Sequence, residues 1–160
     1  MAAAASAAAA REENGDMKKT AFIKSLDHPA IETAIAAAEA NTSGEIRVLV
    51  LPEAAPEPVA TAQAAFARLG MEKTRERNGV LILVAPESQT FAIIGDEGVH
   101  RKCGQAFWDE LAATMTDAFR RGDFTGGVLA GVERAGQLLG EHFPRRPDDT
   151  NELPNQVVGE

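Results

Sequence analysis

The segment from Arg77 to Gly98 constrains the fold of this chain more than any other. Residues 80–85 are almost uninterruptedly apolar, residues 91–95 form a second apolar run, and a short polar turn at 86–89 separates them. Runs of this length indicate strands that are buried on both faces of a sheet. The turn length fits an antiparallel hairpin. The second strand then leads directly into residues 95–98, which we expect to form an acidic loop bracketed by glycines.

The remaining apolar pattern predicts helices around these strands. An additional strand is expected at residues 46–51, and helices are expected at 27–41, 59–70, 105–121 and from 125 onward. The helix between the first two strands predicts a right-handed parallel crossover. We therefore expect an α/β fold, a three-layer sandwich with a central mixed sheet of about three to four strands and helices on both faces.

The chain has the length of one domain, and its ends differ in composition from its centre. Residues 1–20 begin with a low-complexity alanine run and are expected to be a disordered leader. Residues 21–144 carry the helical and strand patterns and form the expected domain. Residues 145–160 are expected to be a disordered acidic tail.

Charge and cysteine content exclude several classes of function. The formal net charge is −8 and the isoelectric point is about 4.9, so binding to a phosphate backbone is not expected. No segment approaches the ~20 apolar residues of a membrane helix, and the leader lacks the pattern of a signal peptide, so we expect a cytoplasmic protein without membrane insertion. Cys103 is the only cysteine, which leaves no intrachain disulfide.

Polar residues stand at the ends of all three expected strands. In the expected topology, the N-terminal ends of two parallel strands and the C-terminal end of the antiparallel strand share one edge of the sheet. Four residues should therefore converge there: Glu45, Asn78, Asp96 and Glu97. Carboxylate and amide oxygens are ligands that Ca²⁺ prefers, so a site for calcium or another divalent cation is expected at this edge. The alternative is that these residues are solvated loop acids and turn formers.

A second candidate site is the pair formed by His100 and Cys103, whose spacing places them on one helical face. Nucleophilic catalysis needs a thiol and a base in such proximity. The alternative is that Cys103 is a small packed residue beside an apolar helix. The common signatures of nucleotide-binding enzymes, zinc proteases and serine hydrolases do not occur in the sequence.

The chain resembles a known family at four motifs, which lie at residues 42–48, 74–82, 93–99 and 141–144. Their order and spacing are similar to those of the TPM domain, which is named for a thylakoid acid phosphatase, a photosystem II repair protein and a modulator of a nematode acetylcholine receptor. The resemblance covers roughly Leu26 to Pro144. It implies an α/β sandwich with a central sheet between helices.

The resemblance implies several activities, because some TPM domains are described as acid phosphatases, some bind calcium and others are accessory factors of membrane complexes. The leading hypothesis is an accessory module that binds Ca²⁺ at the acidic edge and engages an unknown protein partner. Asp96 and Glu97 are expected to be the main ligands, with Glu45 and Asn78 in support. The alternative is a metal-assisted acid phosphatase acting on phosphomonoesters, with Arg47, Arg77 or Arg101 holding the phosphate. Whether the chain is an enzyme stays open at this point.

Overall fold

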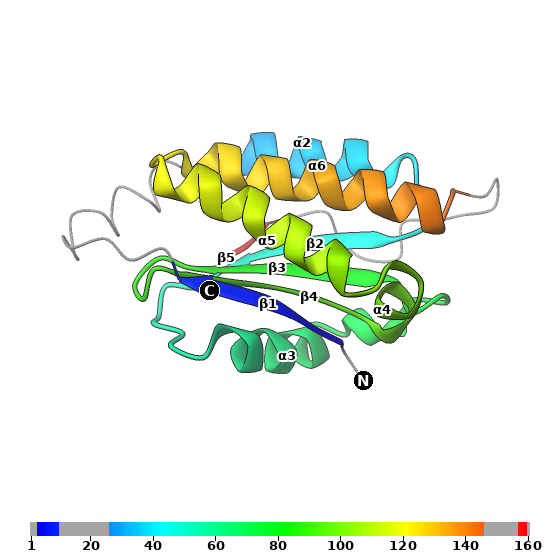
Figure 1. The fold of residues 1–160 in the computed structure, drawn as a ribbon, viewed down its shortest axis with the longest axis horizontal. Helices are drawn as coiled ribbons and strands as arrows, with labels where there is room; N and C mark the ends of the chain where they lie inside the picture. The colour runs from blue at the N-terminus through cyan, green and yellow to red at the C-terminus, as the bar shows by residue number, and fades with distance from the viewer. Residues whose placement is uncertain (1–2, 10–25, 146–156, 160) are drawn as a thin grey trace.

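The computed structural model describes residues 3–9, 26–145 and 157–159, and it shows a mixed sheet between two layers of helices (Figure 1). The strands are β1 (Ala3–Ala9), β2 (Glu45–Val50), β3 (Gly79–Ala85), β4 (Thr90–Gly95) and β5 (Val158–Gly159). The helices are α2 (His28–Glu39), α3 (Pro58–Arg68), the 3₁₀ turn η1 (Met71–Lys73), α4 (Glu97–Cys103), α5 (Gln105–Arg120) and α6 (Phe124–His142). The predicted three-layer α/β architecture is confirmed.

The sheet has the strand order β1-β4-β3-β2-β5. Strands β2 and β3 are parallel, with Glu45 opposite Gly79 and Val50 opposite Val84, and α3 lies in the connection between them. Strands β3 and β4 form the predicted antiparallel hairpin. The sheet therefore has five strands where about three to four were expected, and the outer two, β1 and β5, are those that the sequence did not locate.

Helices α2, α5 and α6 cover one face of the sheet, and α3 covers the other (Figure 1). Side chains alternate between the faces because successive residues of a strand point to opposite sides. Within β3, Val80, Ile82 and Val84 join the core under α2, α5 and α6, whereas Leu81 and Leu83 join the core under α3. Every residue of β3 is buried, as its uninterrupted apolar run predicts.

The helix starts follow from capping chemistry. The side chain of Asp27 accepts a hydrogen bond from the backbone N–H of Ala30 at 3.0 Å, and a proline stands in the first turn of α2. The side chain of Asp123 caps α6 in the same way. Gly70, with a φ of 70°, follows the end of α3 in the left-handed conformation that glycine favours.

Helix α6 packs closely against its neighbours at glycine positions. A Cβ atom on Gly136 would lie 2.5 Å from the Cβ of Ala38 in α2. A Cβ atom on Gly131 would lie 2.8 Å from the sulfur of Met115 in α5. Both values are shorter than real Cβ contacts, so the glycines set how near α6 lies to the two helices.

The expected leader and tail both contain a strand. Residues 3–9 pair antiparallel with β4, and Val158–Gly159 pairs in parallel with Leu49 and Val50 of β2. The reason is that an edge strand leaves backbone N–H and C=O groups without partners, which a further strand satisfies whatever its side chains. The other residues of the expected leader and tail, 1–2, 10–20, 146–156 and 160, lie outside the described residues.

Within residues 26–145 and the two terminal strands, no helix combines the length and the apolar character that crossing a bilayer requires.

Candidate functional site

The ends of β2, β3 and β4 meet at one edge of the sheet, and Glu45, Asn78, Asp96 and Glu97 all lie there. The backbone N–H of Glu45 donates to the carbonyl oxygen of Asn78 at 3.3 Å, and the N–H of Asp96 donates to Gly79 at 2.9 Å. The backbone therefore brings the four residues to neighbouring positions. Their side chains, however, belong to three different hydrogen-bonded groups.

The first group is centred on an ion pair between Arg77 and Asp96. Arg77 Nε lies 2.6 Å from one carboxylate oxygen of Asp96, and Arg77 Nη2 lies 2.8 Å from the other. This bidentate geometry is the strongest form of a side-chain ion pair. The Asp96 side chain is fully buried, and its hydrogen bond raises the pKa of Arg77 above the usual value. Asp96 therefore has both oxygens in use.

Residues 95–98 do not form the expected loop, because Asp96 is the N-cap of α4. Its Oδ1 accepts a hydrogen bond from the backbone N–H of Glu97 at 2.8 Å. The sequence pattern missed this helix because seven residues are too few to show a helical period. The Glu97 side chain is half exposed and lies 3.5 Å from Arg77 and 3.9 Å from Arg101.

The loop before β3 fits tightly against the first turn of α4. Arg77 has a φ of 52°, and its carbonyl oxygen accepts a hydrogen bond from the N–H of Gly98 at 2.9 Å. A Cβ atom on Gly98 would lie 2.3 Å from the carbonyl oxygen of Glu76 and 2.5 Å from that of Arg77. Only glycine fits this position without moving backbone atoms, so Gly98 and Asp96 together fix the loop.

The second group surrounds Asn78, which is buried. Its Nδ2 donates to Ser43 Oγ at 3.1 Å, and Ser43 Oγ donates to Glu76 Oε2 at 2.5 Å. The backbone N–H of Asn78 donates to Thr74 Oγ1. Asn78 Oδ1 is buried and accepts no hydrogen bond from the described residues. A buried carbonyl oxygen without a donor is costly, so this atom is the most unusual feature of the edge.

Glu45 belongs to a buried pair of carboxyl groups that the sequence analysis did not identify. Its partner is Glu39, at the end of α2, whose Oε2 accepts a hydrogen bond from the N–H of Ile46 at 2.8 Å. Burial and the side-chain hydrogen bond with Glu45 raise the pKa of Glu39 to about 9. Glu39 therefore keeps its proton at neutral pH. The sequence did contain a signal for this buried carboxyl group, because Glu39 lies on the same helical face as the apolar residues Ile31 and Ile35.

The side-chain oxygens at this edge differ in how well each could bind a cation. Among the residues that the structure describes, no group of three His, Cys, Asp or Glu side chains is arranged to hold a metal ion. Asn78 Oδ1, which is buried and receives no hydrogen bond from the described part of the chain, fits a hard cation. Asp96 fits less well, because it would have to release Arg77 to bind one.

The three arginines considered for phosphate binding are not brought together as a set. Arg77 forms its ion pair with Asp96. The Arg101 side chain lies on α4 and is 72% exposed. Both arginines also lie within 4 Å of the Glu97 carboxylate. Arg47 is half-buried in the middle of β2, and its Nε is buried without a hydrogen-bond partner among the described residues.

Cys103 lacks the properties of a nucleophile. Burial, together with the charge of Glu141, raises the pKa of its thiol to about 11, so the thiolate is scarce at neutral pH. His100 Nδ1 accepts a hydrogen bond from Trp108 Nε1 at 3.1 Å. The structure therefore favours the interpretation of Cys103 as a packed residue.

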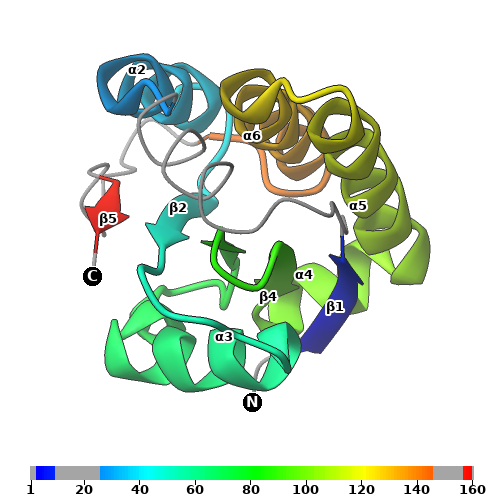
Figure 2. The same cartoon turned by 90° about the vertical axis from the view of Figure 1, so that its left-hand side faces the viewer.

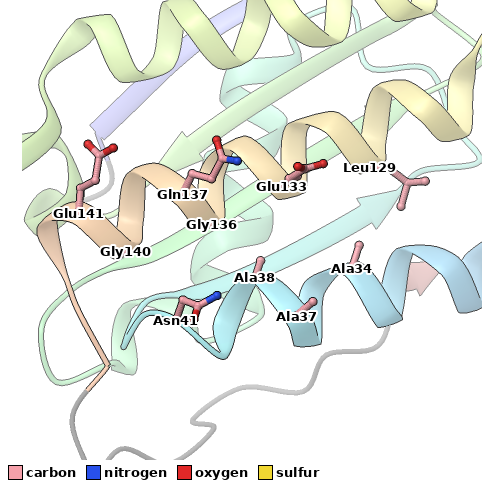
Figure 3. Close-up of a pocket in the computed structure, with 10 residues that line it drawn as sticks. All are labelled: Ala34, Ala37, Ala38, Asn41, Leu129, Glu133, Gly136, Gln137, Gly140 and Glu141. Atoms are coloured by element: carbon pink, nitrogen blue, oxygen red, sulfur yellow. The ribbon is translucent and has the colours of Figure 1, made fainter.

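A groove of about 680 Å³ runs between α2 and α6 (Figure 3). Small residues of both helices line it: Ala34, Ala37, Ala38, Gly136 and Gly140. Leu129, Asn41 and Gln137 complete the lining with two glutamates, Glu133 and Glu141, and no basic residue lines it.

The ion pair gives a direct test of what holds the edge together. Asp96→Ala removes both the partner of Arg77 and the cap of α4, and we expect it to lower the free energy of unfolding by about 3 kcal/mol. Asp96→Asn keeps a capping oxygen, so its loss should be smaller. Urea denaturation followed by circular dichroism measures both. The exposed neighbour Glu97→Ala is the control, and an equally small effect of Asp96→Ala would contradict the role of the pair.

The carboxyl pair predicts that stability depends on pH. The pKa of Glu39 is about 9 in the folded chain against an ordinary 4.5, so between these values the folded chain binds a proton that the unfolded chain releases. The free energy of unfolding should therefore fall as pH rises from 4.5 toward 9. Glu39→Gln should reduce this fall, as urea titrations at about pH 5, 7 and 8.5 will show. Glu57→Gln, an exposed control, should leave the slope unchanged, and an equal slope in Glu39→Gln would refute the assignment.

Comparison with known proteins identifies the family to which this fold belongs. The family model of the TPM domain matches residues 17–138. The NMR structure of the BA42 protein from the psychrophilic bacterium Bizionia argentinensis is 36% identical, with a TM-score of 0.78, over 94% of this chain and 99% of that one. The N-terminal domain of cg2496 from Corynebacterium glutamicum shares the fold at 19% identity and a TM-score of 0.54, over 88% of this chain and 80% of that one. No curated protein matches. The chain therefore belongs to the TPM domain family.

Proposed function

We propose that this TPM domain is a binding module that takes Ca²⁺ at the edge of the sheet and presents a separate groove to a protein partner. The observation that carries the cation part is the buried Oδ1 of Asn78, which lacks a hydrogen-bond donor among the described residues. Ca²⁺ accepts amide, carboxylate and backbone carbonyl oxygens together. A cation at this atom would supply the interaction that the protein does not.

The ligands proposed for the cation come from all three groups at the edge. Asn78 would contribute its amide oxygen, and Glu45 would contribute a carboxylate from the neighbouring strand. Asp96 and Glu97 would join only by giving up Arg77, so cation binding competes with the ion pair. The cation would neutralise part of the acidic edge, and the net charge of −8 favours its accumulation near the protein.

A calcium titration followed by amide NMR tests the cation site. We expect saturable shifts confined to residues 43–46, 76–78 and 95–98. Asn78→Ala should weaken binding by about tenfold, because it removes a buried amide oxygen that has no hydrogen-bond donor among the described residues. Asp96→Asn should report whether the ion pair competes with the cation, since it weakens the hold on Arg77.

The control for this titration is Glu57→Gln, which removes an exposed charge before α3 and should leave affinity unchanged. Shifts spread evenly over the acidic surface would show that the cation is only a diffuse counterion. Unchanged affinity in Asn78→Ala would likewise end the proposal for this site.

The groove between α2 and α6 is the surface proposed for a protein partner. Its alanines and glycines allow another backbone to approach closely, and Glu133 and Glu141 lie about 12 Å apart along one helix. The exposed side of α2 carries Ala36, Ala37 and Ala40, which offer no competing charge. These features suit an amphipathic helix with a small apolar stripe and two basic residues about eight positions apart.

Charge reversal tests this surface with a defined probe. A synthetic helical peptide with an alanine and leucine face and two lysines eight positions apart should bind the protein in fluorescence anisotropy, and more weakly at high salt. Glu133→Lys combined with Glu141→Lys should abolish binding. The control is Glu53→Lys combined with Glu57→Lys, which places the same charge change before α3. An equal loss of peptide binding in both double variants would show that only the net charge of the protein matters, which would contradict the proposed surface.

The alternative function, a metal-assisted phosphatase, rests on the same cation and on a phosphate-binding arginine. Arg47 is the arginine that favours it, because its buried Nε has no hydrogen-bond partner in the described part of the chain. Hydrolysis of p-nitrophenyl phosphate by the calcium- or magnesium-loaded protein, lost in Arg47→Ala, would support this alternative over a binding module.

A further inference from the structure

We propose that the outer edge of β4, between α3 and α5, is a docking site for an extended segment of a partner protein with small side chains, and that residues 3–9 occupy this site within the chain itself. In the structure these residues form β1 and pair antiparallel with β4, from Ala3 opposite Gly95 to Ala9 opposite Thr90. This surface is separate from the calcium edge and from the α2–α6 groove.

The backbone of β4 demands a neighbour on this side. Strand β3 satisfies one side of β4, and β1 satisfies the other. Phe91, Ala92, Ile93 and Ile94 are all buried when β1 is in place, and β1 is the strand that pairs with β4 on this side. Buried N–H and C=O groups without partners are costly, and an open edge is therefore a template for another strand.

The strand that fills this edge lies outside the family domain. The match to the TPM family begins at residue 17, so it includes β2, β3 and β4 but not β1. The three central strands are thus the domain's own, and β4 is the last of them on this side. The strands that form this edge therefore lie within the family match, whereas residues 3–9 precede it.

The composition and surroundings of β1 define what the site accepts. Residues 3–9 consist of six alanines and one serine. The strand contacts α3 on one side of the sheet and α5 on the other, so it runs between two helices (Figure 2). Close helices on both sides favour small, uncharged side chains in an occupant.

Strand β1 pairs weakly with β4, so a partner segment could compete with it for this edge. Alanine is depleted in strands, so β1 gains little beyond its backbone hydrogen bonds. Its pairing with β4 is also irregular between Ala4 and Ala7. A partner segment of alanine, serine and glycine with an occasional valine or threonine would make the same ladder with a stronger strand preference.

The test uses the full chain with β1 disabled and a defined peptide. Ala7→Pro combined with Ala8→Pro removes backbone donors from β1 and frees the edge. The probe is a peptide that repeats residues 3–9 with one valine for alanine and ends in two lysines. We expect saturable amide shifts at residues 90–95 in the variant, and about tenfold weaker binding to the wild-type chain, where β1 competes from within the molecule.

A peptide with prolines at the two matching positions is the control and should not bind. Shifts outside residues 90–95, or equal affinity for the variant and the wild type, would overturn the proposal. A wild-type dimer that the double proline variant converts to monomer would assign the edge to a second copy and would overturn the partner assignment. If the variant fails to fold, a photoreactive version of the peptide on the wild-type chain must label residues 90–95, and labelling elsewhere counts against the site.

Discussion

The ion pair between Arg77 and Asp96 joins three parts of the structure that are separate in sequence. Arg77 lies in the loop before β3, and Asp96 ends β4 and caps α4. Because the carboxylate is fully buried, its charge depends on the guanidinium for compensation. The pair therefore sets the path of the loop that carries Glu76 and Asn78. These two members of the second polar group depend on this loop for their positions.

The same interaction explains why the acidic motif is compatible with a well-packed domain. Asp96 has a structural role, because its carboxylate pairs with Arg77 and caps α4. Gly98 lets the α4 backbone approach the carbonyl oxygens of the preceding loop. The residues available to bind a ligand are those that the ion pair holds in position but that do not belong to it. Asn78, with its buried Oδ1, is the foremost of these.

Much of the architecture was predictable from local signals. The apolar runs of β3 and β4 predicted two central strands, and Asp27 with the following proline predicted the start of α2. Helix α4 was missed because it is too short to show a period. Strand β1 was missed because pairing with β4, and not side-chain preference, makes its alanines extended.

The candidate site was predictable at the level of the backbone only. Strand topology determines which strand ends meet, and it brought Glu45, Asn78, Asp96 and Glu97 to one edge. Which side chains pair depends on three-dimensional packing, and the sequence gives no count of hydrogen bonds per oxygen. Glu39 illustrates the limit, because a helical residue acquires its raised pKa only when a strand buries it against Glu45.

The glycines of α6 have a consequence for how the domain assembles. The helix contains Gly126, Gly127, Gly131, Gly136 and Gly140, and each glycine costs about 1 kcal/mol of intrinsic helix preference relative to alanine. This segment is therefore a poor helix by itself, and its contacts with α2 and α5 must compensate. The close approach that glycine permits is thus available only after those helices are in place. Helix α6 therefore depends more on the surfaces that it completes than on its own helix preference.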